Sequence, residues 1–187
     1  NYKVRKNIII ITSIFLSILA IAVFLFVDGN NTQKKEKNNI SINYQEFVNK
    51  KLPDITVYSK ENKEISIKSI SSGKPVFMMY WASWCPDCQK QLPIIKKLYD
   101  EYKDKIEFIL INIADGERET QDKALSYLKD KEYNFNYYSA TENAIDLLKI
   151  NTIPTKVIVS KDGVVKNIHI EEFSSYEKLK KDIEGEI

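Results

Sequence analysis

Two spacings of hydrophobic residues run along the chain, and each predicts a different kind of element. Continuous apolar runs at residues 75–81 and 106–113 have the length of strands that are buried on both faces of a sheet. Apolar residues three and four positions apart after residue 85 predict an amphipathic helix. The expected buried face of this helix consists of Leu92, Ile95, Leu98, Tyr99 and Tyr102.

Shorter patterns complete the predicted order of elements. Further strands are predicted at 55–58, 64–67, 135–139 (as an edge strand), 156–159 and 164–170, and further helices over roughly 118–131, around 144–148 and from 174 onward. Lys161-Asp162-Gly163 predicts a hairpin turn, and Ser174-x-x-Glu177 predicts a capping box at the start of the last helix. Strands that alternate with helices, followed by a hairpin and a closing helix, predict an α/β fold. Its central sheet is mixed and has helices on both faces.

The N-terminal part of the chain has a different character. Residues 8–27 carry no charge, and about 20 residues in a helix cover roughly the 30 Å hydrocarbon core of a bilayer. This run is longer than the apolar part of a cleaved signal peptide, so we predict a single uncleaved transmembrane helix. Basic residues within 1–7 place that end in the cytoplasm. Residues 28–51 are predicted to be a polar tether with a short helix near its end, and residues 52–187 to be the folded, extracytoplasmic domain.

Composition and charge narrow the possible functions. The formal net charge of the 187 residues is +2, and the basic residues near the N-terminus account for it, so the body of the chain is nearly neutral. This argues against a nucleic-acid partner, which would require a concentrated basic surface. The single histidine, His169, excludes sites that need two histidines. Two cysteines cannot form a disulfide framework or a four-cysteine zinc site.

The two cysteines, Cys85 and Cys88, stand where the predicted central strand gives way to the first long helix. A cysteine at a helix N-terminus faces unpaired backbone N–H groups and the positive end of the helix dipole, which favour the nucleophilic thiolate over the thiol. Pro86 suits the first helical position because its missing N–H costs no hydrogen bond there. Cys88 follows one turn later, where it can close a disulfide and should be less exposed. The sequence thus predicts an attacking thiol followed by a resolving thiol.

A metal site is the alternative interpretation of the same cysteines. Zinc would need two more ligands, and a copper carrier would need His169 to lie near Cys85 and Cys88. His169 falls on a predicted strand after the hairpin, and we expect it at the surface. We therefore favour redox chemistry, with a non-enzymatic metal carrier and an accessory docking protein as rival hypotheses.

The motif around the cysteines resembles the active site of the thioredoxin superfamily. The wider pattern is similar to the membrane-anchored extracytoplasmic branch of that superfamily and covers residues 52 to about 180. The matching segments are Leu52-Pro53-Asp54, Gly73-Lys74-Pro75, Trp81-x-x-Trp84-Cys85-x-x-Cys88, Leu92-Pro93, Ile153-Pro154-Thr155 and Lys161-Asp162-Gly163. The Cys-Pro-Asp-Cys sequence also resembles disulfide-bond-forming proteins of Gram-positive envelopes, streptococcal ones among them.

This resemblance implies a thioredoxin-like fold and assigns roles to individual residues. It implies that Cys85 attacks the substrate and that Cys88 resolves the mixed disulfide. It implies a cis peptide bond before Pro154, with Ile153 offering backbone hydrogen bonds to an extended substrate. The supporting residues of the expected site are Trp84, Pro86, Asp87, Ile153 and Pro154.

Two positions depart from the family's pattern. Many thioredoxins carry a buried acid six residues before the first cysteine, where this chain has Met79. The anchored reductases often carry a glutamate three residues after the second cysteine, where this chain has Gln91. Each of those carboxylates would help the second thiol to attack, and Asp87 is the only carboxylate close by in the sequence. Asp87 itself is expected to be a solvated acid that favours the helix dipole.

The expected function is therefore thiol–disulfide exchange with exported proteins through the Cys85–Cys88 pair. We favour an oxidase that introduces disulfides, because the two carboxylates are missing and a proline follows Cys85. The alternative is a reductase fed by a membrane electron carrier, acting in cytochrome maturation or in the repair of oxidised proteins. We expect no cofactor beyond the cysteine pair, a membrane redox partner, contact with the membrane through residues 8–27, and no nucleic acid.

Overall fold

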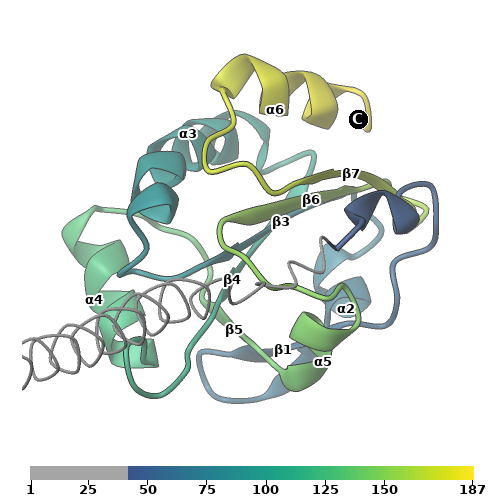
Figure 1. Ribbon diagram of the computed structural model, residues 1–187. Coiled ribbons are helices and arrows are strands. Elements are labelled where there is room, and N and C mark those ends of the chain that lie inside the picture. Colours follow the sequence, from purple (N-terminus) through teal and green to yellow (C-terminus); the bar gives the residue numbers. More distant parts are fainter. Residues whose placement is uncertain (1–41) are drawn as a thin grey trace, which may run out of the picture. The chain divides into compact units, whose positions relative to one another are not determined.

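Strand β3 (Val76–Trp81) lies inside a seven-stranded mixed sheet whose strand order is β2-β1-β5-β4-β3-β6-β7 (Figure 1). The computed structural model describes residues 42–187. The other strands are β1 (Thr56–Ser59), β2 (Glu64–Ser66), β4 (Glu107–Asn112), β5 (Tyr138–Ala140), β6 (Thr155–Val159) and β7 (Val165–His169). Six consecutive buried residues in β3 explain its interior place, because a strand covered on both faces needs no polar alternation.

Strand direction brings two distant segments of the chain together. β3 runs parallel to β4 and antiparallel to β6, with Tyr80 opposite Thr155. The carboxyl end of β3 therefore lies beside the amino end of β6. The residues that follow β3, including Cys85, are thus placed next to the residues that precede β6, including Pro154.

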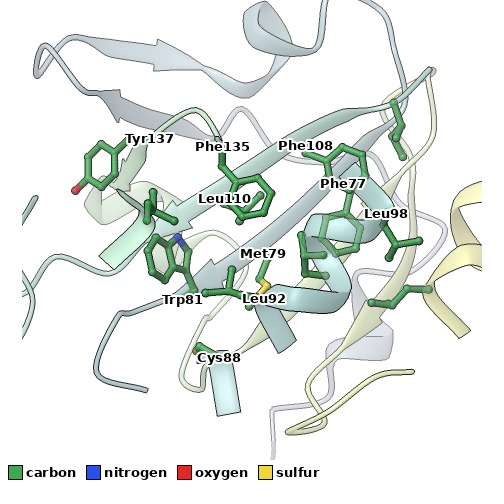
Figure 2. Close-up of a cluster of buried hydrophobic side chains, with 14 of the residues drawn as sticks. Phe77, Met79, Trp81, Cys88, Leu92, Leu98, Phe108, Leu110, Phe135 and Tyr137 are labelled. Atoms are coloured by element: carbon green, nitrogen blue, oxygen red, sulfur yellow. The ribbon is translucent and has the colours of Figure 1, made fainter. Parts of the chain in front are cut away.

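Helices cover both faces of the sheet, as predicted. One hydrophobic cluster joins Phe77, Met79 and Trp81 of β3 to the helices α3 (Pro86–Tyr102), α4 (Gln121–Asp130) and α6 (Tyr176–Glu184) (Figure 2). The alternate residues of β3 pack on the opposite face, with the short helices α2 (Ile67–Ser71) and α5 (Glu142–Asp146). The side-chain alternation of one strand thus divides the interior into two layers.

The folded unit begins earlier than the sequence suggested. Residues 42–51, predicted as part of the tether, pack on the domain, and a single 3-10 turn, η1 (Tyr44–Glu46), takes the place of the predicted short helix. The buried Tyr44 donates its hydroxyl to the Lys149 carbonyl at 3.0 Å and to the Asn151 side chain at 2.9 Å. Lys51 forms a β-bridge with Val164. The polar composition of residues 42–51 predicted a tether because it carries no information on these bonds to distant segments.

The predicted anchor at 8–27, the cytoplasmic end at 1–7 and the tether at 28–41 lie outside the described residues. Within residues 42–187, none of the helices combines the length and the apolar character that crossing a bilayer requires.

Two predicted strands differ in the structure. The strand predicted at 64–67 ends at Ser66, because Ser66 accepts a hydrogen bond from the Ser69 N–H and caps helix α2. The predicted edge strand at 135–139 is displaced to β5 and is not at an edge. β5 lies between β1 and β4, and the edges of the sheet are β2 and β7.

The predicted capping box of the last helix is shifted by one residue. Ser175, not Ser174, accepts the hydrogen bond from the Lys178 N–H and caps α6. Ser174 is instead buried, and both its backbone N–H and its carbonyl are bonded to the side chain of Gln91. The Ser174 hydroxyl donates to the Glu171 carboxylate at 2.7 Å, so Ser175 is the residue that caps the helix.

Candidate functional site

Cys85 is the N-cap residue of helix α3, directly after the turn that ends β3. Its sulfur accepts a hydrogen bond from the backbone N–H of Cys88 at 3.2 Å, and its own N–H donates to Ala82 O at 3.2 Å. Pro86 occupies the first turn, as expected from its missing N–H. The sulfur thus faces an otherwise unpaired N–H at the positive end of the helix dipole, which is the environment that stabilises a thiolate.

Cys88 lies one turn further along and is completely buried, while Cys85 is at the edge of the surface with 4% exposure. Both are free thiols in the structure. Burial raises the pKa of Cys88, and the hydrogen bond with Cys85 and the negative charge of Asp87 act in the same direction. The two thiols therefore differ as an attacking and a resolving thiol should: Cys85 keeps a small exposed fraction at the surface, and Cys88 is enclosed and hard to ionise.

The segment before β6 completes the surroundings of Cys85. The Ile153–Pro154 peptide bond is cis, as the family resemblance implied. The Ile153 carbonyl accepts the Cys85 thiol at 3.8 Å, while Pro154 itself is buried. A backbone carbonyl from the segment before β6, far along the chain, is thereby held within reach of the reactive sulfur.

Trp84 and Asp87 flank the cysteines at the surface. The Trp84 side chain is 38% exposed, and the guanidinium of Arg118 lies 3.9 Å from its ring centroid. Arg118 is itself paired with Asp115 at 3.4 Å. Asp87 forms an ion pair with Lys90 at 3.1 Å on the exposed side of the helix. Asp87 is thus the solvated first-turn acid that the sequence analysis expected, and Trp84 has a cation stacked on it.

The structure adds a residue that the sequence analysis missed, the buried Glu119. Its carboxylate accepts hydrogen bonds from the Ser83 N–H at 2.9 Å, the Ser83 hydroxyl at 2.6 Å and the Asn112 amide at 2.7 Å. The sequence predicted a helix from residue 118, but Thr120 caps α4, so Glu119 is outside the helix and turns inward. Glu119 thereby fastens the turn before Cys85 to the end of β4. A glutamate in a polar loop gives no sequence signal of such burial.

The two positions where the family often carries a carboxylate are filled by structural side chains. Met79 is fully buried and points from β3 toward α3, beside Leu92 (Figure 2). The Gln91 amide donates to Ser174 O at 3.1 Å and accepts from the Ser174 N–H at 2.7 Å. Neither side chain can take a proton from Cys88.

His169 does not join the cysteines. Its Nε2 lies 2.6 Å from an Asp182 oxygen and its Nδ1 lies 3.4 Å from a Glu171 oxygen. The expectation of a surface histidine was also wrong, because only 12% of the side chain is exposed. In the part of the chain that the structure describes, no group of three histidine, cysteine, aspartate or glutamate side chains could hold a metal ion. The contacts of His169 are therefore with two carboxylates.

The sequence is similar to proteins of known function. Residues 73–165 match the family described as thioredoxin-like. The chain is 32% identical over 166 residues to the thiol-disulfide oxidoreductase ResA of Bacillus thuringiensis subsp. konkukian, which covers 86% of this chain and 87% of that protein. It is 30% identical over 165 residues to ResA of Bacillus cereus, with the same coverage of both chains.

Solved structures confirm the fold. A thiol:disulfide interchange protein of the thioredoxin family from Chlorobium tepidum superposes with a TM-score of 0.62 at 19% identity, over 73% of this chain and 94% of that chain. StoA from Bacillus subtilis superposes with a TM-score of 0.58 at 24% identity, over 70% and 96% of the two chains. Since the ResA proteins are matched over most of their length, the chain belongs to the thioredoxin-like family and is a thiol-disulfide oxidoreductase.

Proposed function

We propose that this enzyme exchanges disulfides with exported proteins outside the cytoplasm, with Cys85 as the attacking thiol and Cys88 as the resolving thiol. The observation that carries the proposal is the position of Cys85 at the N-cap of α3, where its sulfur accepts the Cys88 N–H. The enclosed position of Cys88 supports the second role, because an external disulfide cannot reach it.

The exchange proceeds in two steps in either direction. In reduction, the Cys85 thiolate attacks a substrate disulfide and one substrate sulfur leaves as a thiolate. Cys88 then attacks Cys85, closing the Cys85–Cys88 disulfide and releasing the second substrate thiolate. In oxidation, a substrate thiolate attacks the sulfur of Cys85 in the closed disulfide and Cys88 leaves as a thiolate. A second substrate thiol then releases Cys85.

We favour the oxidising direction. Met79 and Gln91 stand where a carboxylate would accept the Cys88 proton before Cys88 attacks, so reductive release lacks that base. A slow resolving thiol is less harmful to a protein that donates its disulfide. The alternative remains a reductase that receives electrons from a membrane carrier. The reduction potential of the Cys85–Cys88 pair separates the two, because about −120 mV is typical of an oxidase and about −270 mV of a reductase.

The proposed location rests on the N-terminal sequence. Residues 8–27 are uncharged and long enough to cross a bilayer, and the basic residues precede them. This arrangement puts the cysteine pair outside the cytoplasm, where disulfides persist. The proposed partners are exported protein thiols and a membrane redox protein.

Covalent trapping of partners tests this proposal. In the full chain with Cys88→Ala, mixed disulfides between Cys85 and its partners should accumulate, because the resolving thiol is gone. The double variant Cys85→Ser, Cys88→Ala is the matched control and should trap nothing. The identity of the trapped proteins reports the substrate class. If the two variants trap the same proteins in equal amounts, Cys85 is not the attacking group.

A further inference from the structure

Lys156 is a fully buried lysine on β6, two residues after the cis proline. It lies opposite Met79 on β3 and opposite His169 on β7. Directly opposed residues in neighbouring strands share a face of the sheet. Met79 belongs to the cluster that contains Cys88, and Ile158, two residues after Lys156, belongs to the same cluster. Lys156 therefore occupies the face of the sheet that α3 covers, the face on which Cys88 is buried.

The Lys156 ammonium has few partners for a buried charge. Among residues 42–187 its Nζ makes one hydrogen bond, to Glu171 O at 2.7 Å, although an ammonium can donate three. The segment that carries Glu171 also carries Ser174, which is bonded to Gln91, one turn after Cys88 on α3. The segment that binds the ammonium is thus fastened to α3, and part of the ammonium's bonding capacity is unused.

The charged groups around Lys156 come from four elements. Glu171 follows β7 and favours the charged form of Lys156, whereas Lys178 of α6 opposes it. His169 of β7 is turned to Asp182 of α6. Cys88 of α3, when it is ionised, also favours the charged form of Lys156.

The groups around Cys88 mostly oppose its ionisation. Asp87 and Cys85 both raise the Cys88 pKa, in addition to burial. Burial raises the pKa of Tyr127 of α4, and a negative charge on Cys88 would raise it further. Burial lowers the pKa of Lys156 to about 8, while the charge on Cys88 raises it. An interaction between two charges is reciprocal, so the ammonium favours the thiolate by the same free energy.

We infer that the Lys156 ammonium is the counter-charge that stabilises the Cys88 thiolate during disulfide exchange, and so replaces the carboxylate that would otherwise assist this thiol. The inference rests on the proposed function and names a positioning residue for it. In reduction, Cys88 loses its proton to water, its thiolate forms beside the ammonium, attacks Cys85 and displaces the substrate thiolate. In oxidation, Cys88 leaves Cys85 as a thiolate beside the same ammonium. A leaving thiol that is easier to ionise leaves faster, so one residue assists both directions.

The two steps can be timed separately with an aromatic disulfide, dithiobis(nitrobenzoate), at one equivalent per reduced full chain. Attack by Cys85 releases the first coloured nitrothiolate, and resolution by Cys88 releases the second. With Lys156→Met, the second phase should slow by about tenfold at neutral pH, and its apparent pKa should rise by about one unit. The first phase should stay within about twofold, because the Cys85 sulfur keeps its own hydrogen bond from the Cys88 N–H at the start of α3.

Three further variants separate charge from structure. Lys156→Arg keeps the positive charge and should restore the second phase. Lys156→Gln keeps a hydrogen-bond donor for Glu171 O but no charge, and should behave like Lys156→Met. Lys166→Gln on β7 removes a lysine outside the site and should leave both phases unchanged. Circular dichroism and thermal unfolding of each variant confirm that it is folded.

Each failure has a distinct meaning. If Lys156→Gln restores the wild-type second phase and pH profile, Lys156 acts only as a structural donor and the inference is wrong. If folded Lys156→Met resolves at the wild-type rate, the counter-charge does not matter. If the wild-type chain releases no second nitrothiolate, the proposed roles of Cys85 and Cys88 fail, whatever Lys156 does.

Discussion

Two buried ionisable side chains lie on opposite sides of β3, and their surroundings differ. On the β4 side, the Glu119 carboxylate accepts three hydrogen bonds from Ser83 and Asn112. On the β6 side, Lys156 donates one, to a carbonyl, within the described part of the chain. A buried charge whose bonds are complete holds a structure in place, whereas one with bonding capacity to spare can respond to a charge that appears nearby. The same interior thus contains a structural charge and a responsive one.

Removal of the structural charge should have the largest effect. Glu119→Ala leaves the Ser83 N–H without its partner and the Asn112 amide with only its 3.4 Å hydrogen bond to Trp81 O, and we expect the free energy of unfolding to fall by about 3 kcal/mol. Urea denaturation of the reduced chain measures this free energy of unfolding. Glu117→Ala in the same loop is the control, because Glu117 is exposed. A loss no larger than that of the control would mean that Glu119 does not fasten the turn before Cys85.

Removal of the responsive charge should change how stability depends on pH. Burial lowers the pKa of Lys156 from 10.5 to about 8, so between these values the unfolded chain binds a proton that the folded chain has released. The Lys156 contribution to the free energy of unfolding therefore rises by about 3 kcal/mol between pH 8 and pH 10.5. Below pH 8 both states are protonated, and this contribution stays constant.

Comparison of the wild type with Lys156→Met isolates this contribution. Cys88 and the buried tyrosines have raised pKa values, so they lower the stability of both chains as the pH rises. The unfolding free energy of the wild type minus that of Lys156→Met should therefore increase as the pH rises from 8 to 10.5. Parallel curves for the two chains would show that Lys156 keeps its ordinary pKa.

The smallest expected effect concerns the exposed contact between Arg118 and Trp84. A cation stacked on an exposed ring contributes about 0.5–1 kcal/mol, so Arg118→Ala should lower the unfolding free energy by no more than that. Acrylamide quenching of tryptophan fluorescence should increase, because Trp84 becomes more accessible while Trp81 stays buried. Arg118→Lys keeps a cation and should show less quenching than Arg118→Ala. If quenching is unchanged in both Arg118 variants, the stacked guanidinium does not shield Trp84.

The sequence predicted the central elements because their signal is local. The apolar run of β3 and the spacing of Leu92, Ile95 and Leu98 on α3 each specify one element without reference to the rest of the chain. The errors arose where distant contacts decide. Tyr44 looks like part of a polar linker until Lys149 and Asn151 are seen to bond it.

In the candidate site, too, the residues with a local signal could be predicted, and those that depend on distant contacts could not. Cys85, Cys88 and the cis proline follow from a motif, since motif residues are adjacent in sequence or recognisable by their neighbours. Glu119 and Lys156 follow from no motif, because each is a single charged residue whose burial depends on segments far along the chain. Charged residues are rarely buried, so a sequence pattern assigns both to the surface.

The anchoring of Tyr44 to Lys149 and Asn151 has a practical consequence for protein production. A shortened chain that started at Leu52, where the motifs begin, would lack this tyrosine and the Lys51–Val164 bridge. The lost contact lies only a few positions before Ile153, so the loop that faces Cys85 would loosen along with the terminus. A truncated gene intended for crystallisation or potentiometry should therefore begin no later than the codon for Ile42.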